Sequence, residues 1–256
     1  MSDVIHVERD GPVLLIRINR QEQRNAINKA TADKLRSAWQ QFDADDSLRV
    51  GVLTGGDEVF CAGADLSDVP ALSEDTLGEN GPLGFTRLRV GKPTIAAAAG
   101  YAVAGGLELA CWCDLRIADE TAVFGCFERR FGVPLIDGGT QRLPRIVGLG
   151  RALEMILTGR PVDASEAKAI GLVNEVVPTG THIQRAVELG KQLARFPQNC
   201  MCNDRLAVYD GLGRSLEDGL RIEAQHGQQT IASGEPTQGA ERFSQGVGRK
   251  GDFSTS

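Results

Sequence analysis

Two glutamates, Glu108 and Glu128, are the residues of this chain best suited to acid and base chemistry. Glu108 lies inside the apolar run from Leu107 to Ala110. Acidic side chains are rarely buried unless they are paired, so this position favours a functional role over a solvated helix face. Two arginines follow Glu128, and an ion pair with either of them is its structural alternative. Two carboxyl groups can serve as acid and base when their surroundings move at least one pKa towards neutrality.

A third carboxylate, Asp137, stands directly before Gly138, Gly139 and Thr140. Aspartate is a preferred N-cap residue, because its side chain accepts hydrogen bonds from the free amides of a helix's first turn. Capping of the next helix is therefore the favoured interpretation of Asp137. An additional acid/base role is the alternative.

Two segments rich in small residues, 60–66 and 100–110, each follow an expected strand. Glycine and alanine let the backbone approach a ligand and turn N–H groups towards it. If Gly105 begins a helix, its amide also lies at the positive end of the helix dipole, which favours a negatively charged acceptor. Each segment taken singly is also explained by a tight turn, the more frequent role of isolated glycines.

Other chemistries lack the spacing that they need. The six cysteines include two Cys-x-Cys pairs but no Cys-x-x-Cys, and no His-x-x-x-His accompanies them, so we expect reduced cysteines and no metal site. Residues 246–251 match Gly-x-Gly-x-x-Gly, but they follow an expected helix at the chain end, where a dinucleotide site needs a preceding strand. The Gly-x-Ser-x-Gly elbow of serine hydrolases is absent.

The elements that must position these residues alternate between strands and helices. A hairpin is expected from stretches 4–8 and 13–18 around Gly11-Pro12, followed by an amphipathic helix at about 29–43 with Asn28 as its cap. Further elements are expected as strands at 49–54, 93–98, 114–118, 122–125 and 172–177, with a helix at 105–111. This alternation predicts an α/β core. Segment 67–91 is irregular, and either a mobile lid or a plain surface loop fits it.

The downstream part of the chain is mostly helical in pattern. Asp163 with Glu166, and Ser215 with Asp218, have the spacing of capping boxes at helix starts. Apolar residues recur at helical spacing after both 183 and 216. We therefore divide the chain into a core, residues 1–195, and a C-terminal helical region, residues 196–256.

Composition limits the kind of partner. The chain has 256 residues, 41% of them hydrophobic, and a formal net charge of −6. An acidic balance without a dense basic patch disfavours nucleic acid. The chain shows neither a secretory leader nor an apolar run of membrane-spanning length. We therefore expect a cytoplasmic protein with a small-molecule substrate and no membrane or nucleic-acid partner.

The whole chain resembles the crotonase superfamily, which includes enoyl-CoA hydratases and isomerases. The shared motifs follow the family's order and approximate spacing, which makes the series far more specific than any one motif. They are Asn19-Arg20, Arg24 to Ile27, Ala62 to Leu66, Lys92 to Ala97, Gly105 to Asp114, Gly138 to Leu143, Leu157 to Gly159 and Ala167 to Val173.

The resemblance implies a fold and an assembly. The α/β crotonase fold is a spiral of ββα units with a C-terminal helical region. By resemblance, residues 196–256 would serve oligomerisation and site closure, giving a homotrimer or a dimer of trimers.

The resemblance also implies a reaction on an acyl-CoA thioester. The backbone amides of Ala64 and Gly105 would form the oxyanion hole that stabilises charge on the thioester oxygen. Glu108 would activate water for attack at C3, and Glu128 would give the proton to C2. The product of a trans-2-enoyl-CoA would be a 3-hydroxyacyl-CoA, with no cofactor other than the coenzyme A of the substrate.

Coenzyme A would be held, by the same resemblance, by residues of two segments: Arg24, Ala26, Ala62, Asp65 and Leu66. The chain departs from the hydratase pattern at Cys126-Phe127, where a Gln-Pro pair is usual, and at Ser67, where some relatives have lysine. Enoyl-CoA isomerisation, with one carboxylate moving a proton between carbons, is therefore the nearest alternative. A non-catalytic binding protein on the same scaffold is a further one.

Overall fold

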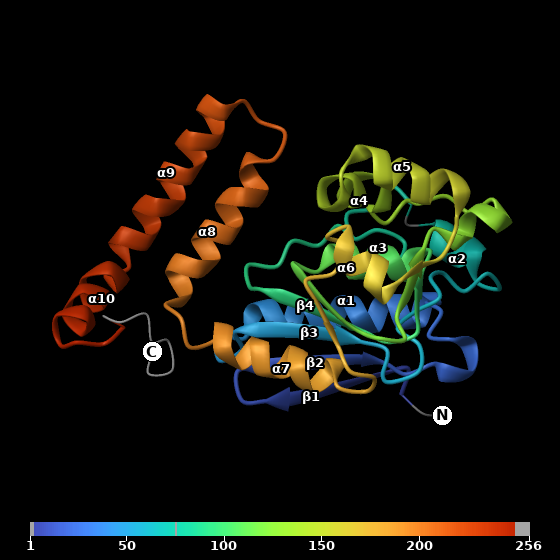
Figure 1. Ribbon diagram of the computed structural model, residues 1–256, viewed down its shortest axis with the longest axis horizontal. Coiled ribbons are helices and arrows are strands. Elements are labelled where there is room, and N and C mark those ends of the chain that lie inside the picture. Colours follow the sequence, from blue (N-terminus) through green and yellow to red (C-terminus); the bar gives the residue numbers. More distant parts are fainter. Residues whose placement is uncertain (1–2, 75, 249–256) are drawn as a thin grey trace.

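The computed structural model describes residues 3–74 and 76–248. Six strands form a large sheet in the order β1-β2-β3-β4-β6-β9 (Figure 1). β1 and β2 pair antiparallel as the expected hairpin, and the remaining neighbours pair parallel. The bounds of these strands are Ile5–Asp10, Val13–Ile18, Val50–Thr54, Thr94–Ala98, Leu115–Asp119 and Glu175–Val177.

A smaller sheet has the strand order β5-β7-β8. Its strands β5 and β7 directly follow β4 and β6 of the large sheet in the chain. It consists of Tyr101–Val103, Val123–Gly125 and Val162–Asp163. β5 leads into helix α3 (Gly105–Trp112), and β7 leads into the 3₁₀ helix η2 (Phe127–Phe131). Val103 and Gly125, the last residues of β5 and β7, are register partners. Glu108 and Glu128 therefore follow strand ends that lie side by side.

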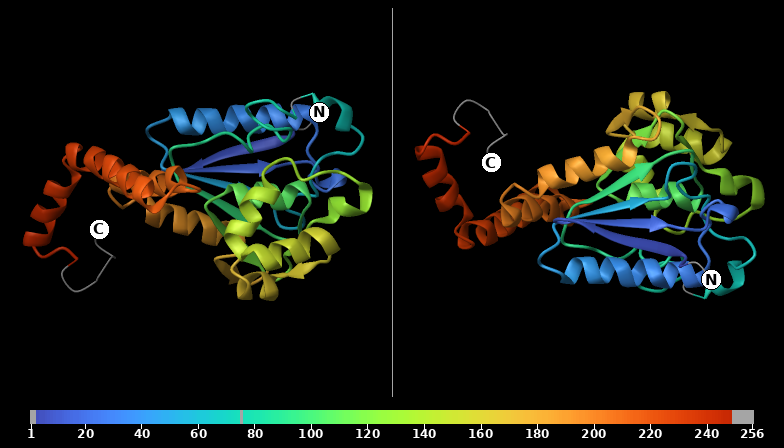
Figure 2. Two further views of the ribbon diagram at one scale, coloured as in Figure 1. Left: turned by 90° about the horizontal axis from the view of Figure 1, so that it is seen from above. Right: turned by 90° about the horizontal axis from the view of Figure 1, so that it is seen from below.

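The large sheet is apolar on both faces, because each face is covered by helices (Figure 2). Helix α7 (His182–Leu193) covers one face, where it packs on residues such as Val13, Val52 and Ile95. Leu14, Ile16 and Leu53, which alternate with them, belong to the main core with helix α1 (Lys29–Ala44). Alternate residues of each strand therefore belong to the core on the α1 side or to the core on the α7 side.

The other helices of the core are short. Their bounds are Gln21–Gln23 for the 3₁₀ helix η1, Val69–Ser73 for α2, Gly139–Val147 for α4, Leu149–Thr158 for α5 and Ala164–Ala169 for α6. The expected strand at 172–177 is real only over β9, from residue 175. Leu172 and Val173 instead donate their amides to the Ala167 carbonyl at the end of α6, which removes them from the ladder.

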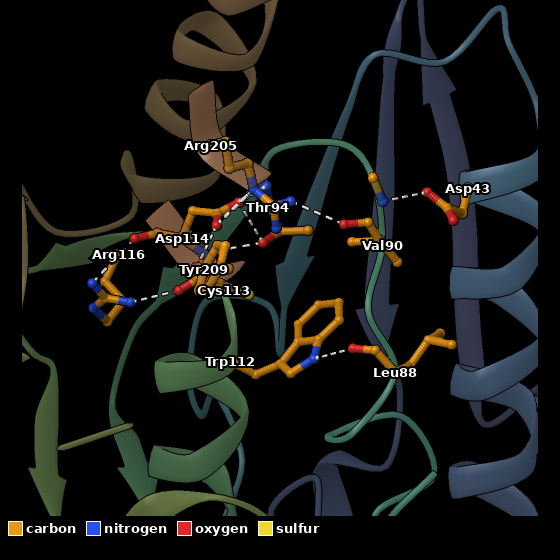
Figure 3. A network of polar contacts seen from close by, with 11 residues as sticks. Asp43, Leu88, Val90, Thr94, Trp112, Cys113, Asp114, Arg116, Arg205 and Tyr209 are labelled. Atoms are coloured by element: carbon orange, nitrogen blue, oxygen red, sulfur yellow. Dashed lines mark hydrogen bonds and ion pairs between the residues drawn. The ribbon is translucent and has the colours of Figure 1, made fainter. Parts of the chain in front are cut away.

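The described residues of segment 67–91, which are 67–74 and 76–91, are irregular apart from α2, as expected, but the second half of the segment is tied to the core. Phe85 is fully buried and packs edge-on against Trp112, with ring centroids 4.8 Å apart. The Trp112 indole donates to the Leu88 carbonyl at 3.0 Å (Figure 3). This half of the segment is a fixed wall over α3 rather than a plain surface loop.

The C-terminal helices α8 (Gln198–Gly211), α9 (Leu216–Ala232) and α10 (Glu235–Ser244) project away from the core (Figures 1 and 2). Asp114, between α3 and β6, anchors them (Figure 3). Its carboxylate accepts hydrogen bonds from Arg205 Nε at 2.8 Å and Tyr209 Oη at 2.6 Å on α8, and from the Thr94 amide at 2.7 Å on β4.

We expect Asp114→Ala to lower the free energy of unfolding by about 2 to 3 kcal/mol, because it leaves a largely buried arginine without its carboxylate. Urea denaturation measures the change. Asp204→Ala is the matched control, since it removes an exposed carboxylate from the same helix and should stay within about 0.5 kcal/mol. A loss at Asp114 no larger than at Asp204 would show that the network does not hold the helices.

Candidate active site

Two backbone amides that have no acceptor among the described residues come together where segment 60–66 meets α3. Gly105 is the first residue of α3, so its N–H has no partner within the helix. In the bridge between Ile27 and Ala64, Ile27 donates to the Gly63 carbonyl and accepts from the Asp65 amide, both at 2.8 Å. The Ala64 amide therefore points away from Ile27, on the opposite side of this bridge.

The backbone conformation at both turns allows this close approach. Gly63 has a φ of +94°, and a Cβ there would lie 2.7 Å from the Gly105 nitrogen. A Cβ on Gly105 would lie 3.4 Å from the Ala64 nitrogen. Ala104, just before α3, has a φ of +52°, which a residue with a side chain rarely adopts. Such strain at a turn that presents two free amides is typical of a functional site.

A cavity of about 260 Å³ opens beside these amides. Ala64 and Gly105 line it together with Glu108, Glu128 and Asp137. Three carboxylates that are separate in the sequence thus share one largely apolar cavity with the two amides.

Glu108 is 3% exposed, so the solvated-face interpretation is wrong. Its Oε1 accepts hydrogen bonds from the amides of Asp137 at 3.0 Å and Gly139 at 2.7 Å. Burial, and after it the neighbouring charge of Asp137, raises the pKa of Glu108 to about 8. Glu108 therefore has a fixed orientation and can gain or lose a proton near neutral pH.

Glu128 is 4% exposed, and neither carboxyl oxygen has a hydrogen-bond partner among the described residues. The ion-pair interpretation is wrong, because Arg129 donates to the Ile156 carbonyl and Arg130 to the Gly159 carbonyl. Burial raises the pKa of Glu128. A buried, unpartnered carboxyl beside a cavity can interact with whatever fills that cavity.

Asp137 is not the N-cap of α4, contrary to expectation. Gly138 occupies that position, with a φ of +104°, and the Gly139 amide already donates to Glu108. Asp137 instead turns to segment 67–91, where its Oδ1 accepts from the Leu83 amide at 3.0 Å and the Thr86 hydroxyl at 2.5 Å. Burial raises the pKa of Asp137 as well.

The expected coenzyme A residues belong to two segments that run side by side. The Ala62 amide donates to the Arg24 carbonyl at 3.0 Å, and Ala62 and Leu66 reach the cavity. Arg24, Ala26 and Asp65 do not line it, and Arg24 is exposed.

Arg20, which the sequence showed only as part of a motif and not as a site residue, joins these two segments. Its guanidinium pairs with Asp65 Oδ2 at 2.9 Å and also donates to the Ala26 carbonyl. The Asn19-Arg20 motif was the signal for it.

Within residues 3–74 and 76–248, no group of three or more His, Cys, Asp or Glu side chains could hold a metal ion. Over the same residues, no helix is long and apolar enough to cross a membrane.

A model of the enoyl-CoA hydratase/isomerase family matches residues 8–252. The chain belongs to this family. It is 37% identical to a probable enoyl-CoA hydratase of Rhizobium meliloti over 94% of this chain and 95% of the relative. It is also 37% identical to the 2,3-dehydroadipyl-CoA hydratase of Escherichia coli, over 88% of this chain and 89% of the relative.

A crystal structure of an enoyl-CoA hydratase from Mycobacterium marinum superposes with a TM-score of 0.90 at 33% identity, covering 94% of this chain and 96% of that one. This similarity confirms the crotonase fold expected from the sequence. The pair β4-β5 before α3 forms one ββα unit, and the pair β6-β7 repeats the pattern with the 3₁₀ helix η2 in place of the α-helix.

The raised pKa of Glu108 has a consequence for stability. At pH 4 the carboxyl is mostly protonated in both the folded and the unfolded chain, so its raised pKa hardly changes the free energy of unfolding. As the pH rises towards 8, the unfolded chain ionises this group more readily than the folded chain does, and the fold is progressively destabilised. We expect Glu108→Gln, whose amide oxygen can still accept both backbone hydrogen bonds, to be more stable than the wild type by about 4 kcal/mol at pH 8 and equal to it near pH 4.

Urea unfolding at the two pH values measures this difference, with Glu58→Gln as a control at an exposed glutamate. Equal stability of Glu108→Gln and the wild type at pH 8 would contradict it.

Proposed function

We propose that this protein catalyses the reversible addition of water to a trans-2-enoyl-CoA, giving a 3-hydroxyacyl-CoA. One observation carries the proposal: two free amides and two buried glutamates surround the same apolar cavity. The names of the relatives support the same reaction.

In the proposed reaction the thioester carbonyl oxygen accepts hydrogen bonds from the Ala64 and Gly105 amides. Glu108 takes a proton from water as the water oxygen bonds to C3. The electrons of the double bond move towards the thioester, where the amides stabilise the developing negative charge. Glu128 gives a proton to C2, and proton exchange with solvent returns both carboxyls to their starting states.

Substrate binding is proposed to extend from the cavity to the segments joined by Arg20. Arg24, Ala26, Ala62, Asp65 and Leu66 would hold coenzyme A, with the exposed Arg24 guanidinium available to a phosphate. Acid/base chemistry at carboxyl groups needs no further group, so we propose no cofactor beyond the coenzyme A of the substrate.

Mass spectrometry of the products of short trans-2-enoyl-CoA substrates tests the reaction. Hydration adds the mass of one water. A product of unchanged mass with a displaced double bond would favour the isomerase. Binding of acyl-CoA without any turnover would instead favour the non-catalytic alternative.

We also propose a homotrimer or a dimer of trimers, assembled through the projecting helices. Supporting this, α8, α9 and the turn between them expose large apolar side chains: Val208, Leu212, Leu216, Leu220 and Ile231. Removal of the chain after Arg195 should therefore lower the assembly state and hydration together, as light scattering and the hydration assay would show. Unchanged assembly with full turnover would contradict this role.

We propose the cytoplasm as the compartment. All six cysteines are free in the structure, which suits a reducing environment.

A further inference from the structure

All of the charged side chains that line the cavity are acidic within the described residues: Glu108, Glu128 and Asp137. The walls between them are apolar and include Val69, Leu72, Leu83, Phe127, Val133 and Ile136. An uncharged acyl group suits such walls, whereas an acyl group that carries its own carboxylate would meet three carboxyls.

The arginines that flank the cavity wall are turned to other partners. Arg130 lies over the Phe127 ring at 4.5 Å on η2. Arg87 donates to three backbone carbonyls, those of Thr76, Gly78 and Ile136. Neither guanidinium lines the cavity.

The Arg142 guanidinium also hydrogen-bonds to the backbone. It donates to the carbonyls of Thr86 at 2.5 Å and Asp137 at 2.9 Å. Arg142 therefore braces the backbone around Asp137 without an ion pair to its carboxylate, and it too is not among the lining residues.

Asp137 has no step in the proposed two-glutamate reaction, yet its carboxyl is fixed in place. Oδ1 is held by the Leu83 amide and the Thr86 hydroxyl. Oδ2 accepts no hydrogen bond from any residue that the structure describes. Asp137 is 4% exposed overall, so this carboxyl oxygen is available mainly to the cavity.

We propose that Asp137 is a specificity-determining residue that makes the site accept uncharged acyl groups and reject acyl chains ending in a carboxylate. This rests on the proposed function only in that the acyl group of an acyl-CoA occupies the cavity. A terminal carboxylate would lose its hydration beside the Asp137 carboxyl, in a cavity that no cation among the described residues lines, and an unpaired buried charge is costly.

Calorimetric binding of two saturated ligands of equal carbon number tests the proposal. Hexanoyl-CoA ends in a methyl group and adipyl-CoA in a carboxylate. At pH 8 we expect the wild type to bind hexanoyl-CoA about 100-fold more tightly than adipyl-CoA. An uncompensated buried charge lowers affinity by roughly that factor.

Asp137→Asn should narrow that ratio by about tenfold, because asparagine keeps an acceptor for Leu83 and Thr86 but has no charge. Glu74→Gln is the matched control: it removes an exposed carboxylate next to the cavity wall and should leave the ratio unchanged. The methyl ester of adipyl-CoA should bind the wild type nearly as well as hexanoyl-CoA does.

Three results would each overturn the proposal: equal affinity of the wild type for the two ligands, an unchanged ratio in Asp137→Asn, or an ester that binds as weakly as the acid. The last would assign the preference to size instead of charge. Because the measurement is binding, it is independent of turnover. Failure of the hydration assay would contradict the proposed function alone.

Discussion

Glu128→Gln is expected to lower the rate of enoyl-CoA hydration by about 10² to 10⁴-fold while leaving the affinity for a saturated acyl-CoA nearly unchanged. Glutamine has almost the same shape but cannot donate the acidic proton that C2 requires. The wild-type carboxyl oxygens have no partner among the described residues, so the substitution breaks no hydrogen bond of the fold. Stopped-time hydration assays and calorimetric binding separate the two effects.

The comparison with Asp137→Asn decides which carboxyls do the chemistry. Because Asp137 is not a helix cap, its replacement should not cost a capping interaction, and asparagine can still accept from Leu83 and Thr86. If Glu128→Gln kept full activity while Asp137→Asn lost it without unfolding, Asp137 would be the additional acid/base and the two-glutamate mechanism would be wrong. The assignment of the cavity to an acyl thioester would stand.

Gly105→Pro is expected to lower kcat by about 10² to 10³-fold, the usual effect of removing one donor from an oxyanion hole. Proline is well accepted at the first position of a helix, which is where Gly105 lies in α3, and it lacks the N–H. The thioester oxygen would then keep only the Ala64 amide. Steady-state kinetics on a short enoyl-CoA measure the loss.

Gly105→Ala is the matched control, because it adds a Cβ but keeps the amide. The new Cβ would lie 2.7 Å from Leu83 Cδ1, the end of a side chain that can turn aside, and 3.1 Å from Gly63 Cα, so the neighbouring turn must shift by a few tenths of an ångström. We expect it to retain at least about a tenth of the wild-type kcat. A backbone ester at residue 105 removes the same donor without a ring, and full turnover in a folded ester protein would refute the role of this amide.

The two glutamates reach one cavity because of how the strands connect. β5 and β7 are parallel neighbours, so the segments that follow them start at the same edge of the small sheet. Glu108 comes one turn into α3, and Glu128 is the second residue of η2. Two carboxyls can therefore share one cavity without contact between their own helices, provided that the strands before them are in register.

The sequence by itself determined the features that depend on near neighbours. Asn28, Asp163 and Ser215 each accept a hydrogen bond from an amide three residues later, as expected for N-caps. The hairpin and the amphipathic helices α1 and α7 also lie where turn residues and apolar periodicity predict them. In every case the interactions that decide the outcome fall within a few residues or along one face of one element.

Only the tertiary structure decided the environment of the carboxylates. Asp137 had a local capping role available, but its Oδ1 takes partners 54 and 51 residues away, at Leu83 and Thr86. Glu128 stands beside two arginines in sequence, yet packing directs both guanidiniums to backbone carbonyls across the fold. The raised pKa of Glu108 likewise comes from burial and from Asp137. Desolvation and charge act through space, so a carboxylate's chemistry depends on distant segments that local spacing does not specify.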